Sequence, residues 1–154
     1  MTGIARGVLF MSLLVSGCAT RMPPTIEPHA PPRPPVPADV VDIRGIWRDK
    51  DLDAAGARAR GLDPALIETP IKLLNVNPTY PTAARQAGIQ GDVMAYCVIG
   101  VDGVPRDCYV HRSVSPELNS GALAAIAGWR FKPLRLAGKE RPALVELRVS
   151  YLLR

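Results

Sequence analysis

The stretch that decides the fold is Ala-Leu-Val-Glu-Leu-Arg-Val-Ser-Tyr-Leu-Leu, residues 143–153. Its side chains alternate in character, so a strand built from it presents a different set on each face. One face carries Val145, Leu147, Val149, Tyr151 and Leu153, and the other carries Leu144, Glu146, Arg148, Ser150 and Leu152. The first set predicts a core face. Pro142 before the strand and charges on the other face are typical of an exposed sheet edge, which they protect against unspecific pairing.

Two more strands are expected upstream, at residues 92–99 and 106–114, because both are rich in Val, Ile, Tyr and Cys. Between them lies Asp102-Gly103, a dipeptide typical of a two-residue hairpin turn. Such a turn places Cys97 opposite Cys108 in the wider, hydrogen-bonded kind of pair, which a bulge near the turn would bring closer. We expect a disulfide between these cysteines, with two buried free thiols as the alternative.

Two helices are expected in the same half of the chain. Residues 80–88 have Pro81 in the first turn and stop at Gly88, which predicts a compact two-turn helix. Ser115 and Pro116 are typical of a second helix start, as N-cap and first helical residue. One stripe of this second helix is apolar: Leu118, Ala122, Ala125, Ile126 and Trp129. The stripe predicts that the second helix covers one face of the sheet.

Short motifs follow one another through this half of the chain: Tyr80-Pro81, Gly88-Ile89, Gly91-Asp92-Val93, Asp102-Gly103, Leu118-Asn119 and Trp129-Arg130-Phe131-Lys132-Pro133. In this order and spacing, and with the alternating strand after them, residues 71–154 resemble the TonB carboxy-terminal domain. The resemblance implies an α+β fold, a three-stranded antiparallel sheet with two helices packed on one face. It implies a binding module and no enzymatic activity, cofactor or metal site.

The resemblance also implies a partner and a site. TonB domains capture an extended peptide of an outer-membrane transporter, which adds as a strand beside the last strand, in energy-coupled transport across the outer membrane. Here the peptide-binding edge would be Leu144, Val145, Glu146, Leu147, Arg148, Val149, Ser150, Tyr151 and Leu152. A TonB-dependent transporter or another envelope protein is the expected partner, and a homodimer stays open.

The amino terminus predicts export. Residues 1–17 contain Arg6, a short apolar run and small residues, as a signal peptide does, and the run is too short to span a bilayer. Val15-Ser16-Gly17-Cys18 resembles a bacterial lipobox, which implies acylation of Cys18. Ala19 after it points to the outer membrane by analogy with enteric lipoproteins, so the domain would face the periplasm. An ordinary secretory signal is the alternative, and a transducer that keeps its leader stays open.

Two segments separate the leader from the domain. Residues 18–38 hold the lipidated cysteine and a proline-rich linker, which predicts an extended tether. Residues 39–70 are expected to be a partly ordered helical segment, with a short helix between positions 52 and 60. Val41, Ile43 and Trp47 in this segment suggest partial burial.

Two further functional hypotheses come from the basic residues and from the polar side chains of the second strand. The net charge of +5 comes from scattered basic residues rather than from a block, which argues against nucleic-acid binding. A structural or accessory envelope lipoprotein that uses this basic surface to hold peptidoglycan or a membrane complex is the alternative function. An enzyme would have to use His111, Asp107, Ser113 and Ser115. Four positions apart on one strand, His111 and Asp107 would stand about 13 Å from each other, beyond hydrogen-bond reach.

Overall fold

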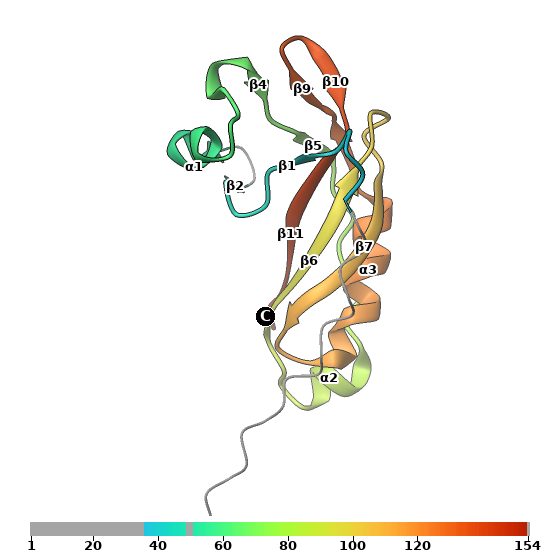
Figure 1. Cartoon of the computed structure of the whole chain (residues 1–154). Helices are drawn as coiled ribbons and strands as arrows, with labels where there is room; N and C mark the ends of the chain where they lie inside the picture. Colours follow the sequence, from blue (N-terminus) through green and yellow to red (C-terminus); the bar gives the residue numbers. More distant parts are fainter. Residues whose placement is uncertain (1–35, 49–50, 154) are drawn as a thin grey trace, which may run out of the picture. The chain divides into compact units, whose positions relative to one another are not determined.

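The computed structural model describes residues 36–48 and 51–153. Its main sheet has the strand order β1-β11-β6-β7 (Figure 1). β6 (Gly91–Ile99) lies between β7 (Pro105–Ser113) and β11 (Ala143–Tyr151) and is antiparallel to both. The fourth strand, β1 (Val41–Asp42), is parallel to β11 and pairs only with its first two residues.

The sheet therefore corrects the expectation of three strands. The three long antiparallel strands are present, but a fourth joins them from the segment before residue 70. The physical reason is burial, because Val41 and Ile43 bring this segment against β11 and are 8% and 0% exposed. The fold as a whole is a mixed α/β fold with several strands and few helices.

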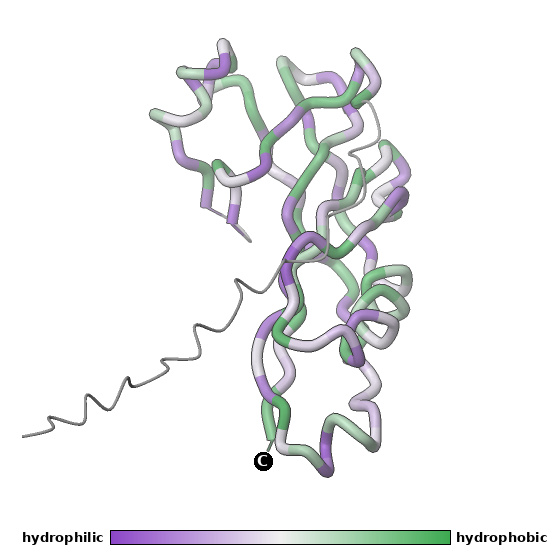
Figure 2. The backbone as a smooth tube through the Cα atoms, turned by 60° about the horizontal axis from the view of Figure 1, so that its bottom comes forward, coloured by the Kyte–Doolittle hydropathy of each residue, from purple (hydrophilic) through white to green (hydrophobic). Residues whose placement is uncertain are grey.

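Two helices belong to the half of the chain that contains the long strands. α2 (Thr82–Gln86) is followed by Gly88 with a positive φ of 67°, and α3 (Asn119–Gly128) follows a 3-10 turn, η2 (Pro116–Leu118). α3 packs on β7 and β6 (Figure 1), and Figure 2 shows it as mainly hydrophobic. Every residue of the expected apolar stripe is buried: Leu118, Ala122, Ala125, Ile126 and Trp129. The prediction of a packed second helix is confirmed.

The β6–β7 hairpin differs from the expected two-residue turn. Gly103 donates its N–H to Gly100 O at 2.9 Å and Gly100 donates to Val104 O at 3.1 Å, which closes a three-residue loop over positions 101–103. Gly103 has φ +73°, the left-handed conformation that such loops place at their third residue. The longer loop shifts the register by one residue, and a bulge at Asp107, with φ +50°, shifts it back.

Shorter elements complete the structure. Before the long strands come β2 (Trp47–Arg48), β3 (Asp51–Leu52), α1 (Ala54–Ala59), η1 (Pro64–Leu66), β4 (Ile67–Glu68) and β5 (Ile71–Leu74). Between α3 and β11 come β8 (Arg130–Lys132), β9 (Leu134–Leu136) and β10 (Lys139–Arg141). β4 pairs with β9 and β5 pairs with β8, so the segment before the long strands is tied to the segment after α3.

The residues before β5 share the core of the sheet. Ile43, Ile46, Trp47 and Ala57 are all buried, and they belong to one hydrophobic cluster that also contains residues of β6, β11 and α3. Asp53 caps α1 by accepting a hydrogen bond from Ala55 N at 3.0 Å, which fixes where this short helix begins. The N-terminal segment is thus positioned beside β11, where the candidate site lies.

Candidate functional site

The candidate site is the outer edge of β11. On its inner side β11 pairs with β6 from Ala143 to Tyr151 without a register shift. On its outer side Ile43 donates its N–H to Leu144 O at 3.0 Å, so the backbone of Leu144 points outward. Because outward and inward positions alternate in an antiparallel strand, Glu146, Arg148 and Ser150 also point their N–H and C=O groups outward. No strand within residues 36–48 and 51–153 pairs with these three.

The side chains along this edge are held by their neighbours. Glu146 Oε1 lies 3.7 Å from His111 Nε2, and Arg148 lies 4.0 Å from the Asp92 carboxylate. The Ser150 hydroxyl donates to Asp92 Oδ1 at 2.6 Å. These contacts link the polar face of β11 to β6 and β7.

A groove of about 980 Å³ lies beside this edge. Glu146, Leu147 and Arg148 line it from β11, and residues of β2 and β5 line it from outside the main sheet. Its lining contains four basic side chains, Arg48, Lys72, Arg112 and Arg148, and two acidic ones, Asp92 and Glu146. Residues of β6 and β7 also belong to the lining, so the groove borders the polar face of the sheet beside Glu146 and Arg148 and has an excess of positive charge.

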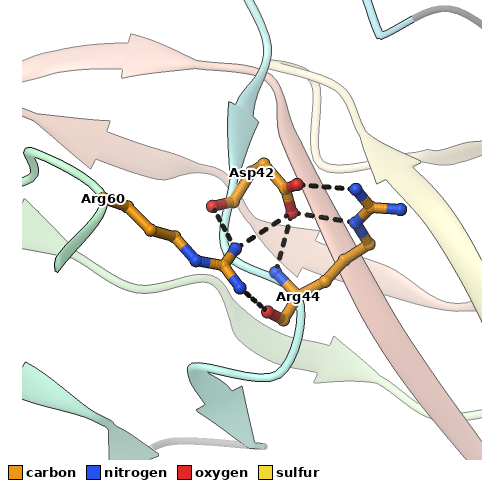
Figure 3. Close-up of polar contacts among 3 residues, drawn as sticks. All are labelled: Asp42, Arg44 and Arg60. Carbon is orange, nitrogen blue, oxygen red and sulfur yellow. Dashed lines mark hydrogen bonds and ion pairs between the residues drawn. The ribbon is translucent and has the colours of Figure 1, made fainter. Parts of the chain in front are cut away.

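One end of the edge is closed by an ion cluster (Figure 3). Arg44 Nη2 lies 2.6 Å from Asp42 Oδ2, and Arg44 Nε donates to Asp42 Oδ1 at 2.9 Å. Arg60, the C-cap of α1, donates to Asp42 O at 3.1 Å and to Arg44 O at 2.8 Å. The cluster ties α1 to β1 and covers the outward carbonyl of Asp42.

The two arginines of the cluster lower the pKa of the Asp42 carboxyl group. Burial by itself would raise the pKa of Asp42, but the hydrogen bonds and charge of Arg44, with the charge of Arg60, hold that pKa below its usual value. Because the folded-state pKa is lowered, the cluster stabilises the fold above the usual carboxyl pKa. That contribution is lost as pH falls through the lowered value.

An aromatic stack supports the same turn. Arg44 lies over the Tyr96 ring, with its guanidinium carbon 5.0 Å from the ring centroid, and the His111 ring stacks on Tyr96 at 3.9 Å with an interplanar angle of 9°. Arg44 is thus held by a carboxylate and by an aromatic face, and each contact favours the charged guanidinium.

Cys97 and Cys108 are joined by a disulfide, with their Cα atoms 4.2 Å apart. The bulge at Asp107 places two residues of β7 opposite Cys97, which brings the second cysteine across from the first. In the chain-entropy model a crosslink that closes a loop this short stabilises a domain by about 3 kcal/mol. The disulfide thus fixes the hairpin that supports β11.

The ends of the expected edge differ from the sequence-based expectation. Leu144 is not available to a visiting strand, because β1 pairs with it and it is 5% exposed. Leu152 follows the end of β11 at Tyr151 and is 71% exposed. Between them, Val145, Leu147, Val149 and Tyr151 face the core, as expected.

Sequence reasoning missed the contribution of β1, Arg44 and Arg60 to the site. A signal was present, because Val41 and Ile43 flank Asp42 with the period-2 alternation of a strand. Arg60 carried no such signal, since its partners lie 16 and 18 residues away in the chain.

The residues of the enzyme hypothesis do not form one cluster. His111 faces Tyr96 and Glu146, Asp107 lies in the bulge, and the Ser113 hydroxyl donates to Ser115 O at 2.8 Å. Within the described part of the chain, no group of three His, Cys, Asp or Glu residues is placed to hold a metal ion.

The expected membrane attachment depends on residues that the structure does not describe. Residues 1–35, and with them the expected signal peptide, Cys18 and most of the linker, lie outside the described residues. Among residues 36–48 and 51–153, none of the helices has the length and apolar character that crossing a bilayer requires.

The comparison with protein-family models matches one family. The family model described as Gram-negative bacterial TonB protein C-terminal matches residues 76–153, more than half of the chain. The chain is also similar to the TonB carboxy-terminal domain of Pseudomonas aeruginosa, solved by solution NMR, with 30% sequence identity and a TM-score of 0.44. This match covers 60% of the present chain and 91% of the Pseudomonas chain. No curated protein sequence matches the chain.

Proposed function

Because this chain belongs to the Gram-negative bacterial TonB protein C-terminal family, we propose that it captures outer-membrane transporter peptides by β-strand addition to β11. It acts as a periplasm-facing module of the cell envelope, in TonB-dependent, energy-coupled transport. The observation that carries the proposal is the outward backbone of Glu146, Arg148 and Ser150, with which no strand of the described residues pairs. Glu146 and Arg148 also line the groove beside this edge.

The physics of strand addition suits this edge. Main-chain hydrogen bonds supply affinity with little demand on sequence, each with a net contribution of about 1 kcal/mol. Three outward residues offer three donors and three acceptors, which is enough for a specific but reversible contact. The positive excess of the groove lining adds a preference for peptides with acidic side chains.

Strand addition predicts a distinctive effect of proline at position 148. Arg148 pairs with Met94, and its N–H points away from β6, so Arg148→Pro removes no hydrogen bond of the folded sheet. It does remove an outward donor and obstruct an added strand. We expect Arg148→Pro to weaken peptide binding at least about tenfold, and Arg148→Ala to change it by no more than about twofold.

The measurement is fluorescence anisotropy of labelled plug-domain peptides from the host's own transporters, titrated with the full chain. Thermal unfolding of both variants checks that the fold survives. Equal binding by the proline and alanine variants would contradict strand addition at β11. If binding were also lost steeply with added salt, attachment through the basic surface would be the better account, as for a structural envelope lipoprotein.

Attachment to the membrane is proposed through acylated Cys18, with the domain held at the periplasmic side of the outer membrane. A domain anchored in this way would dock transporters without being connected to a proton-driven motor through an inner-membrane helix. Metabolic labelling with a radioactive fatty acid should mark the wild-type chain, and Cys18→Ser should abolish the label because the acceptor thiol is gone. An unlabelled wild-type chain would instead favour a cleaved signal or a retained membrane leader.

A further inference from the structure

We propose that residues 41–48 form a stop that fixes the register and the length of the strand that β11 can accept. The inference rests on the proposed function and specifies its partner. Val41 N–H to Pro142 O at 2.9 Å and Ile43 N–H to Leu144 O at 3.0 Å fill the first part of the outer ladder. A visiting strand therefore begins its pairing no earlier than Glu146.

The stop is anchored on two sides. On the core side, Ile43, Ile46 and Trp47 are 0%, 6% and 3% exposed, so displacing the segment exposes a large apolar area. On the polar side, the Asp42, Arg44 and Arg60 contacts hold the turn (Figure 3). Arg44 also lies on the Tyr96 ring. Each anchor opposes the replacement of β1 by a visiting strand, so weakening either one should ease that replacement.

The turn after β1 also directs the backbone of this segment away from the outer edge of β11. After Ile43 the backbone leaves the line of β11 through Gly45, which has φ +73°, and Trp47 and Arg48 then line the groove. The Arg60 guanidinium occupies Asp42 O, so β1 does not offer a second edge on which the visiting strand could continue. A visiting strand can therefore continue past this point neither along β11 nor along the outer side of β1.

The partner follows from this geometry. Outward backbone groups extend from Glu146 to Ser150, so the segment that pairs is about five residues long. At the end that meets Ile43 the visiting chain must either terminate or bend away. The fitting partner is thus a short extended segment next to a chain end or a Gly- or Pro-containing bend, and not a long continuous strand.

The length dependence tests the stop. The probes are capped peptides of alternating valine and threonine, five and nine residues long, titrated with the full chain. In the wild-type chain we expect the two lengths to bind within about threefold of each other. In Arg60→Ala, which frees the turn, the nine-residue peptide should gain roughly tenfold, from about two additional backbone hydrogen bonds. Arg58→Ala, two positions earlier in α1 and with the same charge change, should show no such gain.

Amide hydrogen exchange of the wild-type chain gives an independent readout. Adding the nine-residue peptide should slow exchange at Glu146, Arg148 and Ser150 while Val41 and Ile43 keep their protection. Faster exchange at Ile43 on binding, or a much tighter nine-residue peptide in the wild type, would overturn the stop and make β1 a displaceable competitor. If no peptide protects residues 146, 148 and 150, the proposed function fails instead.

Discussion

Replacing Gly103 by alanine is expected to lower the free energy of unfolding of the domain by on the order of 4 kcal/mol. An added Cβ would lie 1.8 Å from Phe131 O, so backbone, and not a flexible side chain, would have to move. The same glycine accepts a hydrogen bond from Phe131 N at 2.9 Å, which ties the hairpin loop to β8. Its φ of +73° adds a conformational cost of about 1 kcal/mol for a residue with a Cβ.

Gly138 provides the matched control. It has φ +76°, but nothing lies within 4 Å of a Cβ built there, so Gly138→Ala isolates the conformational cost. We expect a loss of about 1 kcal/mol for Gly138→Ala, against the much larger loss for Gly103→Ala. Chemical denaturation of both variants measures the difference. Equal losses would show that the contact with β8 does not matter to the fold.

Trp47→Ala is the second change with a large expected effect, a loss of about 3–5 kcal/mol. Trp47 is 3% exposed and belongs to the hydrophobic cluster shared with the main sheet, so its removal leaves a cavity beside β11. The free energy of unfolding by urea measures the loss. If residues 39–70 contributed nothing to the fold, the variant would unfold like the wild type.

Two controls separate packing from other effects at this site. The indole N–H of Trp47 has no hydrogen-bond partner among the residues that the structure describes, so Trp47→Phe should cost less than about 1.5 kcal/mol. The adjacent Arg48 is exposed, and Arg48→Ala should be close to neutral for stability. A Trp47→Phe variant as unstable as Trp47→Ala would point to a role for the N–H that packing does not explain.

The sequence by itself determined the elements whose signal is local. Alternation in residues 143–153 specified which side chains of β11 are buried, because a strand has a period of two. Helical spacing likewise specified the buried stripe of α3. The short motifs between Tyr80 and Pro133, with the alternating strand after them, were sufficient to indicate the family, which the family match over residues 76–153 then showed.

Only the tertiary structure decided what lies beside β11. The pairing of Ile43 with Leu144 joins residues about 100 positions apart, and no local pattern of apolar residues specifies which strand a two-residue strand will join. The length of the hairpin loop could not be predicted from the sequence either, because Asp102-Gly103 fits a two-residue turn as well as the observed three-residue loop. Arg60 became part of the site only because folding brought its guanidinium to two carbonyl oxygens of a distant turn.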